Sequence, residues 1–283
     1  MDDSLWITTY LKRIRHHGSL EPTEHVLFDL QQCSLTHIPF DNMDIHMNRA
    51  VTVDNLDSIK DKILARGRGG YCYEQNQLFH ELLLRLGFDA KLIRSRAMVD
   101  LKPGQSRPST HAMILVTLKE KSFIVDVAGN SIGSPLPLFL EHETIQEMNG
   151  EKHRVLNRGN NKYSHEILDD SGSWIPLKDF SLDAEIDFQE CAVMNWWTCT
   201  HPSSRHRASL IISVHGKDGF RMICNNCLIE RQGGCKARRT IISSWKEFLQ
   251  ILADDFHVPI KDLQGLTVPN TDWPPLDGSM LLD

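Results

Sequence analysis

One cysteine of the chain has the surroundings of a nucleophile. Arg68-Gly69-Gly70-Tyr71-Cys72 leads directly into residues 74–86, where apolar side chains recur at helical spacing. The free N–H groups and the positive dipole end at a helix start stabilise a thiolate. The sequence therefore predicts a reactive Cys72 with a lowered pKa. The cysteines without such a setting are interpreted as structural: Cys33, Cys191 and Cys199.

A histidine and an aspartate later in the chain could activate this thiol. A thiolate is commonly held by an imidazolium, whose tautomer is fixed by a third group. Asp126 interrupts the apolar run 123–128, and a buried carboxylate is costly unless it is paired. His111, at the start of a nearby alternating segment, is the expected partner. The order Cys, His, Asp, with the cysteine on a helix and the others on strands, is the papain-like arrangement of a thiol acyl-transfer site.

Three units must position these residues. The first ninety residues read as mostly helical, whereas residues 88–140 alternate with the period of strands and contain a turn-rich connection at 102–108. A polar stretch at 141–173 indicates loops and edge strands. Residues 209–215 read as a strand, and a helix is predicted around residues 245–256. We predict a helical unit at 1–88, a β-rich unit at 89–195 and a smaller α/β unit at 196–283.

Composition excludes several other classes. The 283 residues carry a net charge of −6 with no Lys/Arg-rich block, so a nucleic-acid partner is not expected. The N-terminal residues show no apolar core of a secretory signal, and the apolar runs are too short to cross a membrane. Seven cysteines, an odd number, favour free thiols in a reducing compartment. We therefore expect a cytoplasmic protein without a membrane partner.

Several motifs resemble the arylamine N-acetyltransferase family, and especially its bacterial members. Residues 68–76 are close to the family's RGGxCxExN signature, and Thr110-His111 and Asp126-Val127 follow in the family's order. The other matching segments are Tyr10-Leu11-Lys12-Arg13-Ile14, Ile38-Pro39-Phe40-Asp41-Asn42, Trp174-Ile175-Pro176-Leu177, Asp187-Phe188 and residues 195–204. The resemblance covers roughly residues 6–260.

This resemblance implies an α+β, three-domain fold with a helical bundle, a β-barrel and an α/β lid around a papain-like Cys-His-Asp site. It implies a ping-pong enzyme without a permanently bound cofactor. Acetyl-CoA, or a related acyl thioester, would acylate Cys72, and an arylamine, hydrazine or N-hydroxyarylamine would then accept the acyl group. His111 would relay protons and Asp126 would orient it. The further roles that the resemblance implies are acceptor-pocket walls at Phe40, Tyr73 and Gly129, coenzyme A contacts at Thr200, Ser203 and Ser204, and structural support from Arg68 and Asn76.

Two departures from the family pattern leave alternatives open. Ala128-Gly129-Asn130 replaces the usual Gly-Phe-Gly, so the aromatic wall of the acceptor pocket is missing. Arg205-His206-Arg207 replaces an aromatic residue followed by asparagines. We interpret it as a solvated basic turn, with nucleotide phosphates or an acidic carrier protein as alternative partners. An amide synthase fed by an acyl carrier protein, a cysteine hydrolase and a non-catalytic binding protein are the competing functions.

A second cysteine motif could in principle bind a metal. Cys224-Asn225-Asn226-Cys227 has half of a zinc-ribbon spacing, with Cys235 eight residues further on. Because a second CxxC pair is lacking, the pair is interpreted as reduced turn cysteines and no metal site is expected.

Overall fold

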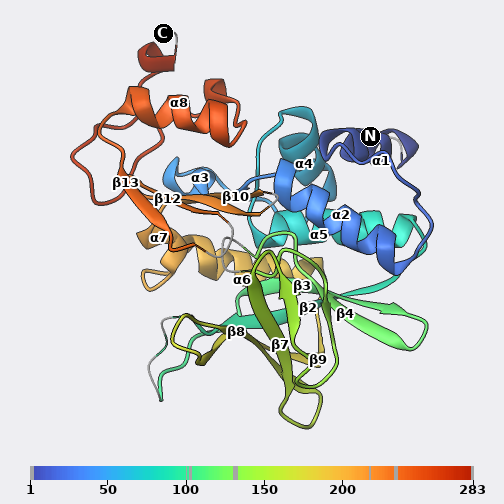
Figure 1. Cartoon of the computed structure of the whole chain (residues 1–283). Coiled ribbons are helices and arrows are strands. Elements are labelled where there is room, and N and C mark those ends of the chain that lie inside the picture. The colour runs from blue at the N-terminus through green and yellow to red at the C-terminus, as the bar shows by residue number, and fades with distance from the viewer. Residues whose placement is uncertain are drawn as a thin grey trace.

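Three groups of elements surround a central junction (Figure 1). The computed structural model describes residues 3–99, 101, 104–129, 133–216, 218–232 and 235–281. N-terminal helices lie beside a strand-rich unit from the middle of the chain, and the C-terminal part forms a second sheet covered by a helix (Figure 1). The fold is the α+β arrangement that the sequence predicted.

The N-terminal unit is built from short helices that pack on a common core. Thr23 caps one of them by accepting a hydrogen bond from Val26 N, and Asn55 caps another through two backbone N–H groups. The helices are α1 (Asp3–Arg13), α2 (Glu24–His37), α3 (Met43–His46), α4 (Leu56–Lys60) with a π-helical continuation (Asp61–Ala65), and α5 (Cys72–Arg85). The predicted helix after Cys72 is thus confirmed, and its apolar face is buried.

The middle of the chain forms an antiparallel sheet of eight strands in the order β5-β4-β3-β2-β9-β8-β7-β6. A bridge between His142 and Val155 and the approach of β5 to β7 bring the sheet close to a closed barrel. The strands are β2 (Asp89–Ala97), β3 (His111–Leu118), β4 (Lys121–Val125), β5 (Leu138–Phe139), β6 (Gln146–Met148), β7 (Glu151–Asn157), β8 (Lys162–Leu168) and β9 (Trp174–Glu185). The stretch 141–173, predicted as loops and edge strands, therefore includes three regular strands.

The C-terminal unit has a five-stranded sheet in the order β1-β10-β11-β12-β13. Its first strand comes from the N-terminal region, because Phe40 pairs with Ser213. The elements are β1 (Phe40–Asp41), α6 (Phe188–Thr200), α7 (Arg205–Ala208), β10 (Ile211–Gly216), β11 (Gly219–Cys224), β12 (Cys227–Gln232), β13 (Arg238–Ile241) and α8 (Trp245–Asp255), followed by 3-10 turns at Ile260–Asp262 and Gly278–Leu281. The predicted strand at 209–215 and helix near 245–256 are confirmed.

The buried apolar side chains form three clusters. The largest joins the N-terminal helices to strands β2, β3 and β4 and includes Cys72. A second lies between α8 and the C-terminal sheet, and a third lies among the strands of the eight-stranded sheet. Helix α6 runs across the predicted 195/196 boundary. The residue limits of the three domains stay a prediction.

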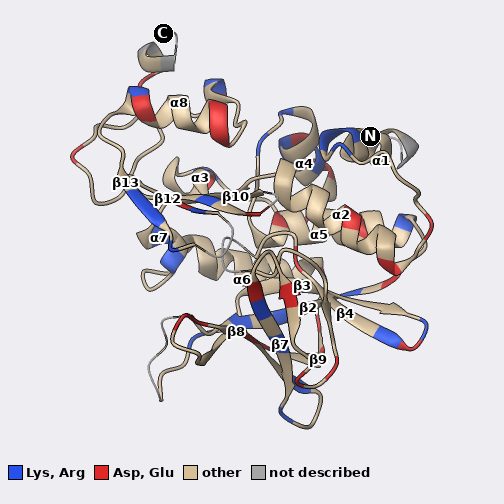
Figure 2. Cartoon of the chain, viewed as in Figure 1, with Lys and Arg blue, Asp and Glu red and all other residues tan. Residues whose placement is uncertain are grey.

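Charged residues are mixed over the surface (Figure 2). Basic side chains gather on α7 and β13, whereas α8 carries charges of both signs (Figure 2). Within the described ranges, none of the helices has the length and apolar character needed to cross a bilayer.

Candidate active site

The backbone before Cys72 is held in a tight turn. A Cβ on Gly69 would lie 2.2 Å from the carbonyl oxygen of Pro39, so only glycine fits at that position. Gln75 Nε2 donates to the carbonyl oxygens of Pro39 and Gly70 at 2.9 and 2.7 Å. These contacts fix Cys72 as the first residue of α5, where the sequence placed it.

A buried charge cluster supports the same turn. Glu74 accepts a hydrogen bond from Tyr71 N at 3.1 Å and pairs with Lys62 at 2.8 Å. Lys62 also pairs with Asp44 at 2.5 Å, and Arg68 lies 3.3 Å from the other oxygen of that carboxylate. Arg68 is fully buried, so its guanidinium braces the loop from inside the protein.

His111 and Asp126 come together as the sequence predicted. His111 begins β3, Asp126 follows β4, and His111 Nε2 donates to Asp126 Oδ2 at 2.7 Å. Asn76 Nδ2 donates to Asp126 Oδ1 at 2.9 Å and to Ala112 O at 2.8 Å, and Asn76 Oδ1 accepts from Val127 N at 3.0 Å. One turn of α5 after Cys72, Asn76 thus fixes the carboxylate relative to the helix that carries the thiol.

A lysine that the sequence analysis missed contacts the same carboxylate. Lys178 of β9 is buried, and its Nζ forms an ion pair with Asp126 Oδ2, the oxygen that also accepts from His111. Burial by itself would raise the pKa of Asp126, but Lys178 and His111 hold that pKa well below its ordinary value. The carboxylate is therefore ionised.

The predicted lowering of the Cys72 pKa is wrong for the free enzyme. The thiol is buried, and burial raises its pKa well above the ordinary value. Hydrogen bonds from the backbone of Ala112 and Tyr73 act in the opposite direction and are outweighed, and the Asp126 charge raises the pKa further. The helix terminus alone does not produce a thiolate, so Cys72 needs a neighbouring base.

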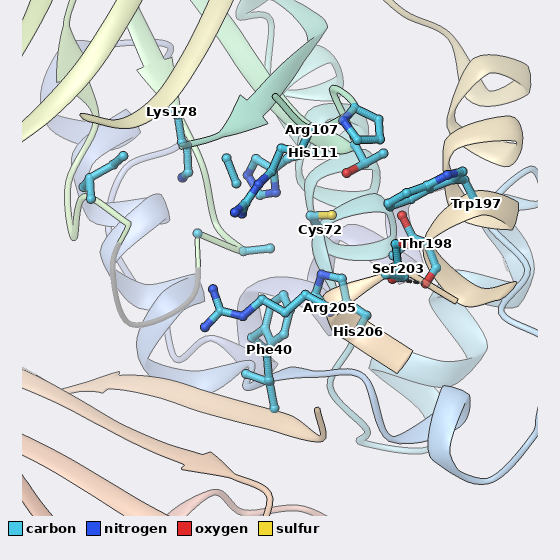
Figure 3. Close-up of a pocket in the computed structure, with 18 residues that line it drawn as sticks. Phe40, Cys72, Arg107, His111, Lys178, Trp197, Thr198, Ser203, Arg205 and His206 are labelled. Atoms are coloured by element: carbon cyan, nitrogen blue, oxygen red, sulfur yellow. Dashed lines mark hydrogen bonds between the residues drawn. The ribbon is translucent and has the colours of Figure 1, made fainter. Parts of the chain in front are cut away.

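Cys72 and His111 both line a cavity of about 400 Å³ between the three units (Figure 3). Phe40, Gly129, Ser203 and Ser204 also line it. Tyr73 does not, because its ring packs against Tyr71 and its hydroxyl lies 3.5 Å from Thr198 Oγ1. Thr200 does not line the cavity either, since its hydroxyl donates to Trp196 O within α6. Asn130 lies outside the described residues.

The basic segment after Ser204 is only partly a surface turn. Arg205 and His206 of α7 line the cavity, together with Arg107 from the connection before β3 (Figure 3). The His206 ring lies between Phe40 and Tyr71, with ring centroids 6.0 and 5.8 Å away. Burial, followed by the charge of Arg205, lowers the pKa of His206 to about 4, so this ring is neutral at pH 7. Residue spacing could not predict that Arg205 and His206 lie at the cavity, because α7 is a single turn.

The second cysteine motif is a hairpin. Cys224 and Cys227 pair across the two-residue turn between β11 and β12, and both thiols are free. Among the residues that the structure describes, no three His, Cys, Asp or Glu side chains gather closely enough to hold a metal ion.

These features define a thiol-dependent acyltransfer site on a three-part α+β fold, and comparison with known proteins gives its family. The family model described as N-acetyltransferase matches residues 25–264, and the chain belongs to this family of enzymes. The arylamine N-acetyltransferase of Mycobacterium tuberculosis (strain H37Rv) is 28% identical over 268 residues, which cover 92% of each chain. That of Escherichia coli K12 is 28% identical over 220 residues, covering 77% of this chain and 75% of the relative.

Solved structures agree with this assignment. The structure of the Mycobacterium marinum arylamine N-acetyltransferase in complex with CoA is 27% identical, with a TM-score of 0.84 and coverage of 91% of this chain and 94% of that one. The resemblance seen in the motifs is confirmed, as is its bacterial character. These relatives do not support the amide synthase fed by a carrier protein.

Proposed function

We propose that the enzyme transfers an acetyl group from acetyl-CoA, through a thioester on Cys72, to an aromatic amine, hydrazine or N-hydroxyarylamine. The observation that carries the proposal is that Cys72 and His111 line one cavity while His111 is bonded to the ionised Asp126. The names of the relatives and the CoA complex of one of them support the donor and the acceptor class.

In the donor half-reaction, His111 acts as the base that the buried thiol requires. Its Nε2 is hydrogen-bonded to Asp126, so Nδ1 is the ring nitrogen that accepts the proton of Cys72. The thiolate attacks the thioester carbonyl, the bond between that carbon and the coenzyme sulfur breaks, and the imidazolium supplies the proton that CoA takes away. Asp126 stabilises the imidazolium between these two proton transfers.

In the acceptor half-reaction the same groups act on the acetylated enzyme. The amine nitrogen attacks the thioester carbonyl, and neutral His111 takes the proton from that nitrogen. The carbon–sulfur bond breaks, the amide leaves, and the imidazolium returns its proton to the Cys72 sulfur.

The cavity walls suggest where the two substrates bind. Arg107 and Arg205 place guanidinium groups at the cavity that Ser203 and Ser204 also line, an arrangement suited to the phosphates of a nucleotide thioester. Phe40 offers an aromatic wall to the acceptor, and Gly129 also lines the cavity, where it adds no side chain. Contacts from Thr200 and Tyr73 have less support, since neither side chain reaches the cavity.

The direct test is incubation with acetyl-CoA in the absence of an acceptor. We expect one acetyl group on the peptide containing Cys72, seen by intact-mass and peptide mass spectrometry, and no adduct on C72A. Folded enzyme that stays unmodified would contradict the proposal. A C72A variant that still transfers acetyl groups would contradict it as well.

The acceptor and the alternatives are separated by a substrate panel. Acyl-CoA thioesters of increasing length are tested against a fixed aromatic amine and a fixed hydrazine. Transfer to both acceptors, fastest from acetyl-CoA, is the expected result. Thioester hydrolysis without an amide product would instead identify a cysteine hydrolase. A cytoplasmic location is proposed because the mechanism needs Cys72 as a free thiol.

A further inference from the structure

Lys178 is a buried cation in direct contact with the group that orients the base. It lies on β9 between β2 and β8, where it pairs with Ala97 on one side and with His165 on the other. Its side chain lines the cavity (Figure 3). Its Nζ pairs with Asp126 Oδ2, to which His111 Nε2 donates at 2.7 Å. One carboxylate oxygen thus serves both the lysine ammonium and the imidazole.

Among the residues that the structure describes, the other partners of the Asp126 carboxylate carry no charge. Its Oδ1 accepts from Asn76 Nδ2 at 2.9 Å and from Ala128 N at 3.0 Å. The negative charge that would otherwise favour an imidazolium at His111 is therefore offset by one cation, Lys178. A carboxylate already paired with an ammonium attracts a second cation less strongly than a free carboxylate does.

The other charged and titratable groups near Lys178 and Asp126 are either uncharged or, like Lys178, disfavour an imidazolium at His111. His165 of β8 is buried beside Lys178, and burial, His153 and Lys178 lower its pKa well below the ordinary value, so it adds no charge. His206 of α7 is neutral at pH 7. Arg107 and Arg205 add positive charge at the cavity wall, and Cys72 of α5 is uncharged once it is acetylated.

We infer that Lys178 is a positioning residue that keeps His111 in its neutral form for the acceptor half-reaction, by neutralising the Asp126 carboxylate that it shares with the imidazole. This inference rests on the proposed acetyl transfer, whose two half-reactions require different charge states of His111. The donor step requires an imidazolium only transiently. The acceptor step requires a base that is free of its proton before the amine attacks.

The acetylated enzyme provides a clean test, because Cys72 no longer titrates and His111 is the base that remains. Enzyme acetylated with acetyl-CoA is freed of coenzyme and mixed with a hydrazine. The single-turnover rate of acetyl transfer is then followed from about pH 4.5 to about pH 8.5, which is roughly two units either side of the ordinary histidine pKa. In K178M we expect the acid limb of this profile to move up by about one pH unit. K178R, which keeps the charge, should retain the wild-type midpoint.

Two further variants separate charge from packing. K178Q keeps a donor to Asp126 without the charge and should shift the profile as K178M does. K91M removes an exposed lysine that pairs with Glu185 on the neighbouring strand, and should leave the midpoint unchanged. A uniform loss of rate at every pH in K178M and K178Q, without a shift, would overturn the inference and assign Lys178 a purely structural role.

A measurement on the wild-type protein keeps the inference testable even where the variants do not fold. Nitrogen NMR of the acetylated enzyme should show His111 neutral at pH 7, with its proton on Nε2. An imidazolium at that pH would overturn the inference. Failure of the wild-type enzyme to form the acetyl thioester would instead contradict the proposed function, so the two failures are distinguishable.

Discussion

The Asn76 side chain is the residue that connects the nucleophile helix to the Asp126 carboxylate. Its three hydrogen bonds, to Asp126, Ala112 and Val127, are all buried. In N76A the carboxylate and the Val127 N–H lose partners, so we expect a loss of about 1–3 kcal/mol in the free energy of unfolding. Because Asp126 then orients His111 less well, acetylation of Cys72 should slow by about tenfold or more, equivalent to about 1.4 kcal/mol.

Chemical denaturation and single-turnover acetylation of N76A measure the two effects. Q77A is the matched control, because Gln77 is equally buried but donates to Tyr73 O within its own helix. Q77A should lose stability while keeping the acetylation rate of the folded protein. Equal rates in the two variants would show that Asn76 only stabilises the fold.

The neutral His206 ring makes stability depend on pH. Its pKa falls from 6.5 to about 4 on folding, chiefly through burial. Between these values the unfolded chain binds a proton that the folded protein excludes, so this contribution to stability is complete above pH 6.5 and is lost as the pH falls toward 4. In H206F the free energy of unfolding should therefore fall less steeply over that window than in the wild type.

Urea unfolding at several pH values tests this dependence on His206. H25Q serves as the control, because the His25 side chain is exposed and pairs only with Asp29 in the next helical turn. Parallel pH dependences for H206F and the wild type would show that the ring does not resist protonation in the folded state.

At the scale of elements, the ammonium of Lys62 links the π-helical segment 61–65 to α3 and α5 through ion pairs. It lies between Asp44 at 2.5 Å and Glu74 at 2.8 Å, and all three side chains are largely buried. K62M leaves the buried Glu74 carboxylate without this counter-ion and leaves Asp44 with the 3.3 Å contact to Arg68, so we expect a loss of about 3–5 kcal/mol in unfolding free energy. K121M, which breaks an exposed pair with Glu24, should cost less than about 1 kcal/mol.

Thermal and urea unfolding of the two variants measure this difference. Since Glu74 also accepts from Tyr71 N at the start of α5, K62M should in addition slow acetylation of Cys72. A K62M protein as stable as K121M would mean that the buried carboxylates take up protons in place of the lysine.

The elements differ in how far the sequence determines them. Apolar spacing predicted α5 and the strands β2, β3 and β4, and the cost of a buried charge predicted the His111–Asp126 pair, because these signals are local. Lys178 was missed because its contact with Asp126 depends on β9 lying between β2 and β8, a pairing set by the whole sheet. His206 was interpreted as part of a solvated basic turn, and its packing was missed for a similar reason, since Phe40 and Tyr71, the rings beside it, come from the N-terminal part of the chain.

On the scale of the whole molecule, the cavity has walls from the N-terminal, middle and C-terminal units, so its shape depends on how the C-terminal unit is held against the N-terminal helices. Strand β1 contributes to this by pairing with β10, and Asn42, directly after β1, adds three side-chain hydrogen bonds. Its Nδ2 donates to His206 O at 3.0 Å and Ser209 O at 2.8 Å, and its Oδ1 accepts from Ile211 N at 2.7 Å. One side chain thus fixes α7, which carries Arg205 and His206 to the cavity.

In N42A these bonds are lost, so we expect a loss of about 2–4 kcal/mol in unfolding free energy. We also expect faster amide hydrogen exchange at Ile211. Because α7 then samples more positions at the cavity, KM for acetyl-CoA should rise more than kcat falls. N226A removes a single long hydrogen bond, from the side chain of Asn226 to Ile242 O at 3.4 Å, and should leave both kinetic constants near wild type. An N42A enzyme with unchanged KM and unchanged exchange at Ile211 would show that sheet pairing alone keeps the C-terminal unit in place.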